Sequence, residues 1–409
     1  MKRTWKRIAG GIFALGMLGS MGAISASAEE TTIQLWHYYE GEVEVGLLKS
    51  ICQEYCDAHE GINIDVTYVP REELTKQYTM GSMSGELADI GMVDNPEMAA
   101  YIQMGAFADI TDYFNEWDEK DVWYDGPMSS CTGTDGRLYG LPQNSNCLAL
   151  YYDTVIFDEL GLEIPTTWDE LSACCATIKE AYPDKYPLGF SAFNNEEGTF
   201  QFTPFLISAG GSFDNLAGEA GVKALTYWCD LLNNGYVSKD VINWGQGDLT
   251  TQWCAGNVVM MVNGPWNFST IEEQAPGKEY GVCLLPKDQE YASVLGGENF
   301  VVTSACEDKD LGWDILSWIC NGENMARYCE GVGKFMPRSD YAEYSDIWET
   351  NEKLMAFNEG MQYAVTRGPS PQWGEQSGYI STAIQEALTG EKTPEQALND
   401  AQAGIDALK

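Results

Sequence analysis

The decisive stretch is IQLWHYYEG, residues 33–41. Its apolar residues Ile33–Trp36 predict a first β-strand, and the polar residues that follow predict a turn. An amphipathic helix comes next, and Gly61 ends it. One face of this helix collects its apolar residues, which are Val43, Leu47, Leu48, Ile51, Cys52 and Tyr55. A strand, a turn and a helix in this order are typical of the first unit of an α/β fold.

The same alternation continues along the chain. Ile62, Ile64, Val66 and Tyr68 alternate with polar residues and predict a second strand, and Asp89–Val93 predicts a third after a short helical segment. Strands that alternate with helices favour a mainly parallel sheet.

A second block starts near Leu141. Cys147–Tyr152 predicts a buried strand, and Thr167 with Glu170 forms a capping box before a helix at 168–182. Further strands are expected at 188–190, 258–262, 280–285 and 296–304, and further helices at 200–208, 218–233, 249–255 and 311–320. Thr393, Pro394 and Gln396 open the last helix.

The first 28 residues have the order of a secretory signal peptide. Lys2, Arg3, Lys6 and Arg7 precede an apolar stretch, and Ala26-Ser27-Ala28 provides a cleavage site before Glu29. A retained membrane anchor is the alternative, because the apolar stretch is close to the minimum needed to span a bilayer. The glycines within the stretch favour cleavage after Ala28.

The mature chain is strongly acidic and large. Cleavage removes four of the 23 basic residues and none of the 62 acidic ones, which leaves a formal net charge of −43. Such a charge argues against nucleic acid, anionic lipid and anionic solutes as partners. The remaining 381 residues exceed one ordinary core and predict two lobes. Most of the twelve cysteines lie in apolar runs, and with only His37 and His59 beside them we expect no metal centre and no cofactor.

Several segments together resemble family 1 extracellular solute-binding proteins of ABC importers, of the carbohydrate type that is similar to maltose-binding protein. Besides residues 33–41, the segments that match in order are Gly85-Glu86-Leu87-Ala88-Asp89-Ile90, Leu138-Tyr139-Gly140-Leu141-Pro142 with 148–153, Ala255-Gly256-Asn257 with 258–262, Gly264-Pro265-Trp266, and Gly296-Gly297-Glu298-Asn299-Phe300. Ala88 departs from the pattern, since proline is usual there. Trp36-His37 with Glu40-Gly41 also resembles glycerol-phosphate binders of the same family.

The resemblance implies a fold of two Rossmann-like α/β lobes with a hinge and a ligand cleft between them, the type II periplasmic-binding-protein arrangement. It places residues 29–140 and 295–340 in one lobe and residues 141–294 and 341–409 in the other. It implies a monomer that captures a sugar or oligosaccharide, performs no chemistry on it and delivers it to an ABC permease. The residue directly after Ala28 is Glu29 and not cysteine, so we expect a periplasmic or extracellular protein without a lipid anchor.

Loops directly after strands are the place to look for binding residues, because ligands of open α/β sheets lie beyond the carboxyl ends of strands. A sugar needs aromatic rings for its C–H faces and carboxylates or amides for its hydroxyls. These rules, with the resemblance, predict twelve ligand-binding residues: Tyr38, Tyr39, Glu40, Asp94, Asn95, Asn144, Ser145, Trp266, Glu298, Asn299, Arg338 and Trp373.

Two other functions stay open at this stage. The first is the binding of another solute, such as a phosphorylated polyol, a polyamine or a peptide. An exported glycoside hydrolase would also be acidic and aromatic, and would need a pair of carboxylates about 5 to 10 Å apart. Against an enzyme, Gly81-Ser82-Met83-Ser84-Gly85 places methionine where a nucleophile elbow has serine.

Overall fold

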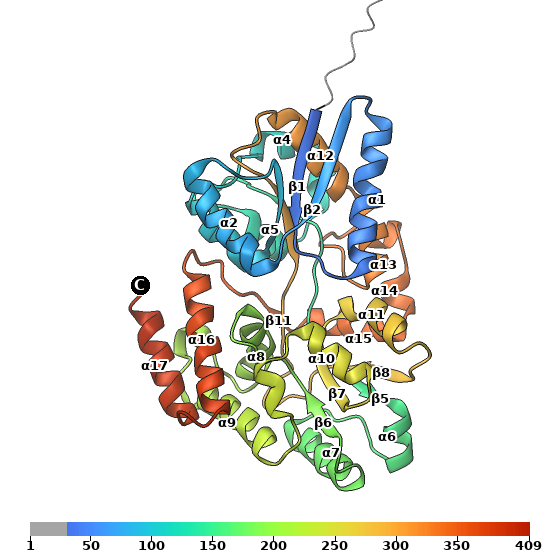
Figure 1. Ribbon diagram of the computed structural model, residues 1–409, viewed down its shortest axis with the longest axis vertical. Coiled ribbons are helices and arrows are strands. Elements are labelled where there is room, and N and C mark those ends of the chain that lie inside the picture. Colours follow the sequence, from blue (N-terminus) through green and yellow to red (C-terminus); the bar gives the residue numbers. More distant parts are fainter. Residues whose placement is uncertain (1–30) are drawn as a thin grey trace, which may run out of the picture.

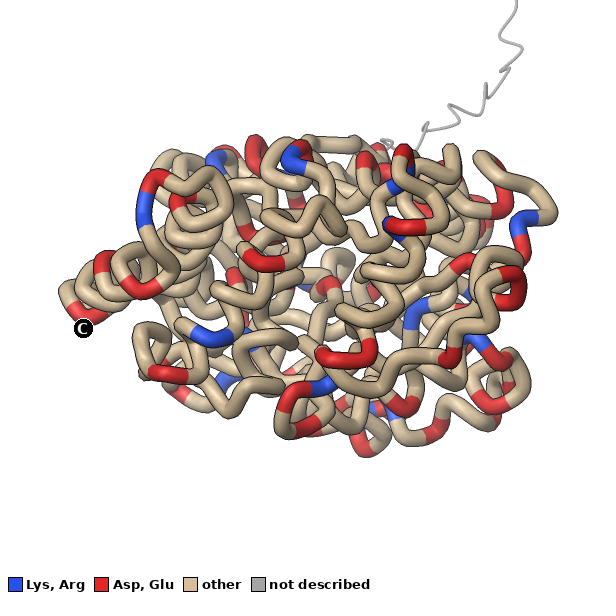
Figure 2. The backbone as a smooth tube through the Cα atoms, turned by 90° about the horizontal axis from the view of Figure 1, so that it is seen from below, with Lys and Arg blue, Asp and Glu red and all other residues tan. Residues whose placement is uncertain are grey.

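The computed structural model describes residues 31–409 and shows two sheets, one above the other, each surrounded by helices (Figure 1). The predicted signal peptide, residues 1–28, lies outside the described residues. Within residues 31–409, no helix is long and apolar enough to cross a membrane. Acidic residues are spread over the backbone in Figure 2, and basic residues are fewer.

The five-stranded sheet has the order β2-β1-β3-β10-β4. Its strands are β1 (Thr31–His37), β2 (Ile62–Tyr68), β3 (Ile90–Asp94), β4 (Leu141–Pro142) and β10 (Glu298–Val302). β1 runs parallel to β2 and β3, because helices connect these strands, whereas β10 is antiparallel to β3 and β4. The helices of this lobe are α1 (Glu42–Ala58), α2 (Arg71–Ser84), α3 (Met98–Gln103), α4 (Thr111–Glu116), α5 (Asp125–Cys131), α12 (Lys309–Cys320) and α13 (Gly322–Val332).

The four-stranded sheet has the order β6-β7-β5-β8. Its strands are β5 (Ala149–Asp153), β6 (Tyr186–Gly189), β7 (Val258–Asn263) and β8 (Tyr280–Cys283). The helices of this lobe are α6 (Thr154–Leu160), α7 (Trp168–Ala181), α8 (Glu196–Ser208), α9 (Glu219–Asn233), α10 (Gln246–Cys254), α11 (Phe268–Gln274), α14 (Ile347–Thr350), α15 (Glu352–Met361), α16 (Trp373–Leu388) and α17 (Pro394–Asp406). A short parallel pair joins β9 (Ser293–Val294) to β11 (Ala364–Val365).

The predicted helix caps are confirmed. Thr167 accepts a hydrogen bond from the backbone N–H of Glu170 at 3.3 Å, and the Glu170 carboxylate accepts one from the N–H of Thr167 at 3.2 Å. Thr393 and Gln396 form the same reciprocal pair at the start of α17. These bonds satisfy N–H groups that a helix leaves without partners in its first turn.

The expectation of a mainly parallel sheet is confirmed, with one reversed strand in each sheet: β10 in the five-stranded sheet and β5 in the four-stranded sheet. In the four-stranded sheet β6 and β7 are parallel neighbours, and β5, which lies between β7 and β8, is antiparallel to both. The two reversed strands, β5 and β10, adjoin segments where the chain passes between the lobes, so they enter their sheets from the opposite direction. A βαβ pattern predicts parallel pairing only where the chain stays in one lobe.

The chain passes between the lobes in three segments that lie side by side, here called the crossing segments; they contain Asn146, Gly296 and Phe335. Asn146 and Gly296 exchange backbone hydrogen bonds of 3.0 and 2.9 Å, and Ser145 and Phe335 exchange bonds of 2.7 and 2.8 Å. β4 pairs with β10, so the first crossing follows Pro142, two residues later than the boundary expected from the resemblance. The crossing segments bring loops from both sheets to one place.

Candidate functional site

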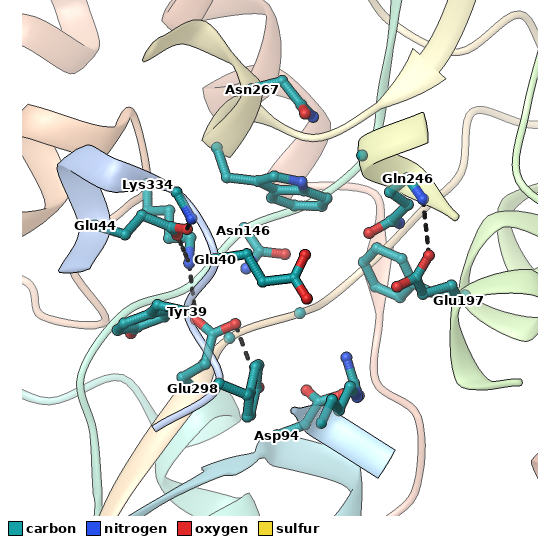
Figure 3. A pocket seen from close by; sticks show the side chains of 18 of the residues that line it. Tyr39, Glu40, Glu44, Asp94, Asn146, Glu197, Gln246, Asn267, Glu298 and Lys334 are labelled. Carbon is teal, nitrogen blue, oxygen red and sulfur yellow. Dashed lines mark hydrogen bonds and ion pairs between the residues drawn. The ribbon is translucent and has the colours of Figure 1, made fainter. Parts of the chain in front are cut away.

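A cavity of about 210 Å³ lies between the two lobes (Figure 3). Its walls come from the loop after β1, the start of α2, the end of β3, the starts of α8 and α10, the turn after β7 and the crossing segments. The cavity thus lies beyond strand ends of both sheets, the usual position of ligands in open α/β folds.

The loop after β1 forms one wall. Tyr39 is buried; its hydroxyl donates a hydrogen bond to Gln143 at 3.2 Å, and its ring stacks on that of Tyr328 with centroids 5.3 Å apart. The Tyr38 hydroxyl lies 3.5 Å from a carboxylate oxygen of Glu298. Glu40 is exposed and extends into the cavity (Figure 3). Because Tyr39 is fixed on several sides, the loop presents Glu40 from a rigid base.

A buried lysine holds two carboxylates beside this loop. Lys334 is 2% exposed, and its Nζ lies 2.9 Å from Glu44 and 3.1 Å from Glu298. The ammonium also lies 4.7 Å from the ring centroid of Tyr39, within range of a cation–π contact. Burial alone would lower the pKa of Lys334, but the two carboxylates outweigh burial and raise it. Lys334 is therefore a fixed positive charge in the cavity wall.

A second ion cluster joins the lobes. Asp94, at the end of β3, pairs with Arg71 at the start of α2 and with Arg367 at 3.3 Å. Arg367 also pairs with Glu196, in the first turn of α8, at 2.5 Å. Burial alone would raise the pKa of Asp94, but Arg367 and Arg71 outweigh burial and hold it below its usual value. Arg367 thus bridges a carboxylate of one lobe and a carboxylate of the other.

The opposite wall is aromatic and amide-rich. Trp266 lies in a 3₁₀ turn, η5 (Pro265–Asn267), directly after β7, and is partly exposed to the cavity. Its ring centroid is 6.4 Å from that of Phe200. Gly264 leaves space for the indole, since a Cβ there would lie 1.8 Å from the Trp266 ring. Glu197 accepts a hydrogen bond of 2.8 Å from the backbone N–H of Gln246 (Figure 3).

Six of the twelve residues predicted from the sequence line the cavity. They are Tyr38, Tyr39, Glu40, Asp94, Trp266 and Glu298. All six follow, end or begin a strand at the edge where the lobes face each other, as the strand-end rule expects. Their contact with a ligand stays a prediction.

The other six lie outside the cavity lining, and three of them support it from behind. Asn144 donates a hydrogen bond of 3.2 Å to the Tyr39 hydroxyl, Asn95 accepts one of 3.2 Å from Arg367, and Ser145 is buried in the first crossing segment. Their amides and backbone hold lining residues in position. For these three the prediction found the right region, but the residues lie behind the cavity lining and not in it.

The remaining three are occupied elsewhere. Asn299 donates a hydrogen bond of 3.0 Å to Ser130. Arg338 is buried and pairs with Glu119 and Asp340. Trp373 begins α16, is 2% exposed, packs edge-on against Phe213 and donates a hydrogen bond of 2.9 Å to Glu196. The sequence shows a proline-rich loop before Trp373, but not that Phe213 and Glu196 from other segments contact the indole.

Sequence reasoning missed several lining residues. They are Glu44, Arg71, Asn146, Glu196, Glu197, Phe200, Gln246, Lys334 and Arg367, among others. Arg71 lies three residues after β2, so the strand-end rule itself contained the signal for it. Lys334 follows helix α13, and Arg367 follows the two-residue strand β11, which the sequence did not indicate; only tertiary structure brings the two residues to the cavity.

Comparison with known proteins agrees with this arrangement. A family model described as bacterial extracellular solute-binding protein matches residues 50–356. A putative binding protein of Brucella abortus is 24% identical over 418 aligned positions, which cover 99% of this chain and 98% of the relative. A maltooligosaccharide ABC transporter solute-binding lipoprotein of Streptococcus pneumoniae is 21% identical, over 86% of this chain and 84% of the relative.

A solved structure has the same fold. An ABC transporter solute-binding protein from Thermotoga lettingae, bound with α-D-tagatose, superposes with a TM-score of 0.85 and is 26% identical, covering 92% of this chain and 99% of that chain. The expected type II arrangement of two lobes is confirmed by this likeness.

Among residues 31–409, no group of three or more histidine, cysteine, aspartate or glutamate side chains has the geometry to hold a metal ion.

Proposed function

The chain belongs to the family of bacterial extracellular solute-binding proteins, and we propose that it captures a carbohydrate in the cavity between its lobes and delivers it to the permease of an ABC importer. The assignment of a carbohydrate rests on one observation: the same cavity combines the partly exposed Trp266 ring with carboxylate and amide side chains. The ligands named for the pneumococcal and Thermotoga proteins are also sugars.

The chemistry of the walls suits a polyhydroxylated ring. The face of Trp266 supplies an apolar plane for C–H groups, and Asn146, Gln246 and Glu40 supply donors and acceptors for hydroxyls. Because these groups come from both lobes, a sugar between them contacts both. Its binding stabilises the closed form by contacts that the open form lacks, which gives the permease a closed shape to recognise.

The proposal also includes the export of the chain and its location outside the cytoplasm. The signal peptide at residues 1–28 directs the chain out of the cytoplasm, and the mature protein acts as a monomer in a periplasm or at the cell surface. We propose that it carries no lipid anchor, because Glu29 and not cysteine follows Ala28; the pneumococcal relative is by name a lipoprotein. Mass spectrometry of the mature N-terminus separates the two forms.

Calorimetry tests the proposal. Titration of neutral mono- and oligosaccharides should give saturable binding, and Trp266→Ala should weaken it by about 1–3 kcal/mol if the indole covers the ligand. Trp318→Phe is a control, since Trp318 lies in α12 of the other lobe, away from the cavity lining. Binding of no sugar, or equal affinity for Trp266→Ala and the wild type, contradicts the proposal.

Two further measurements test the remaining parts. Small-angle scattering should show smaller dimensions with a saturating sugar, and unchanged dimensions count against closure. Incubation with aryl glycosides should release no aryl alcohol, and a turnover that depends on a cavity carboxylate identifies the protein as a hydrolase instead.

A further inference from the structure

The cavity carries more negative than positive side chains. Six carboxylates line it, against three cations: Glu40, Glu44, Asp94, Glu196, Glu197 and Glu298 against Arg71, Lys334 and Arg367. With every group ionised, the lining has a net charge of −3. Such an excess attracts a cation and repels an anion.

All three cations are already engaged. Lys334 pairs with Glu44 and Glu298. Arg71 and Arg367 pair with Asp94, and Arg367 also pairs with Glu196. Four of the six carboxylates are therefore paired with a cation of the protein itself.

Glu40 and Glu197 have no ion-pair partner in the part of the chain that the structure describes. Glu40 accepts a hydrogen bond of 3.1 Å from the hydroxyl of Tyr68, and Glu197 accepts the backbone N–H of Gln246 at 2.8 Å. Burial raises the pKa of Glu197, and the charge of Glu40 raises it further, although the Gln246 N–H and Arg71 oppose the shift. The two carboxylates thus repel each other, and the charge that opposes this at Glu197 is that of Arg71, which is itself paired with Asp94.

Their positions give this repulsion a consequence for closure. Glu40 follows β1 of the five-stranded sheet, and Glu197 is in the first turn of α8, beside the four-stranded sheet. Figure 3 shows both side chains extending into the cavity. Trp266 and Phe200 also line this cavity. Like charges on opposite lobes oppose closure, whereas a cation between them attracts both, and the aromatic rings beside them favour a cation over an anion.

We propose that the captured carbohydrate is an amino sugar, whose ammonium group lies between Glu40 and Glu197 while its ring lies against Trp266. The inference rests on the proposed function, because it assigns a chemical class to the sugar in the same cavity. Glu40 and Glu197 are then the residues that select an amine over a hydroxyl, since both groups can donate a hydrogen bond to a carboxylate but only the ammonium adds the attraction between opposite charges.

Matched ligand pairs provide the test. Calorimetry at pH 7.5 compares glucosamine with glucose, galactosamine with galactose, and the glucosamine disaccharide with cellobiose, with N-acetylglucosamine as an uncharged amide and spermidine as an amine without a sugar ring. The amino sugar of at least one pair should bind about tenfold more tightly than its neutral partner. Acidification should weaken amino-sugar binding, because protonation removes the charge of Glu197.

Variants locate the effect. Glu40→Gln and Glu197→Gln should each reduce the ratio of amino-sugar to neutral-sugar affinity, and Glu219→Gln, at the exposed start of α9, should leave the ratio unchanged. Thermal unfolding of each variant checks that it is folded.

The outcomes separate this inference from the proposed function. Neutral sugars that bind as tightly as their amino partners overturn the inference and leave carbohydrate capture standing. An amine preference that survives both substitutions overturns the assignment to Glu40 and Glu197. Binding of spermidine without any sugar overturns both the amino sugar and the carbohydrate.

Discussion

Replacing Lys334 by methionine should destabilise the protein more than any surface substitution of a lysine. The ammonium is 2.9 Å from Glu44 and 3.1 Å from Glu298, and its side chain is 3% exposed. At an effective dielectric constant of about 20, each contact has a gross attraction of about 5–6 kcal/mol. The cost of burying the charges offsets much of this attraction. Methionine keeps the length of the side chain but leaves two mostly buried carboxylates without their cation, for which a loss of about 3–5 kcal/mol is expected.

Urea unfolding at pH 7, followed by circular dichroism and by tryptophan fluorescence, measures this loss. Lys392→Met is the matched control, because Lys392 also contacts two carboxylates, Glu386 at 2.9 Å and Asp400 at 2.8 Å, but its side chain is 30% exposed. A solvent-exposed pair contributes about 1 kcal/mol or less. The contrast between the two variants isolates burial from the number of contacts.

The reasoning is refuted if Lys334→Met and Lys392→Met lose the same stability within about 1 kcal/mol. The triple variant Lys334→Met/Glu44→Gln/Glu298→Gln gives a second check. It removes the two charges that methionine leaves unpaired, so it should be more stable than Lys334→Met alone. A triple variant less stable than the single one would show that lost packing, not unpaired charge, causes the loss.

Three further predictions concern the other parts of the site. Arg367→Met should lower the free energy of unfolding by about 3 kcal/mol, because it leaves Glu196 without its ion pair and Asp94 with Arg71 alone; equal urea midpoints for variant and wild type would contradict it. Burial, with a smaller contribution from Lys49, lowers the pKa of His37 to about 4, so the folded state binds fewer protons than the unfolded state between pH 6.5 and 4. The wild type should therefore lose stability relative to His37→Gln as the pH falls through this window, and parallel pH profiles of melting temperature would exclude it. Gly264→Ala places a Cβ 1.8 Å from the Trp266 ring and should weaken ligand binding by displacing the indole, whereas Gly46→Ala, with open space around its Cβ, should not; unchanged calorimetric affinity for Gly264→Ala would show that the indole does not contact the ligand.

The strands and helices were predictable where one local pattern decides them. The alternation of Ile62–Tyr68 gives the bounds of β2, and the capping boxes at Thr167 and Thr393 mark helix starts that the structure confirms. The direction of β10 was not predictable in this way. Its antiparallel pairing with β3 depends on where the chain returns from the other lobe, and local periodicity carries no information on that path.

The residues of the site likewise differ in whether a local pattern or a tertiary contact brings them to the cavity. Residues that follow a strand, such as Glu40 and Trp266, reach the cavity because the strand end fixes their position. Arg367 reaches Asp94 across 273 positions of sequence, and no local pattern indicates which of many carboxylates it neutralises. The charge of the lining is therefore a tertiary property. With 62 acidic residues in the sequence, no local pattern distinguishes one carboxylate from another, and only the ion pairs of Lys334, Arg71 and Arg367 show that Glu40 and Glu197 have no ion-pair partner among the described residues.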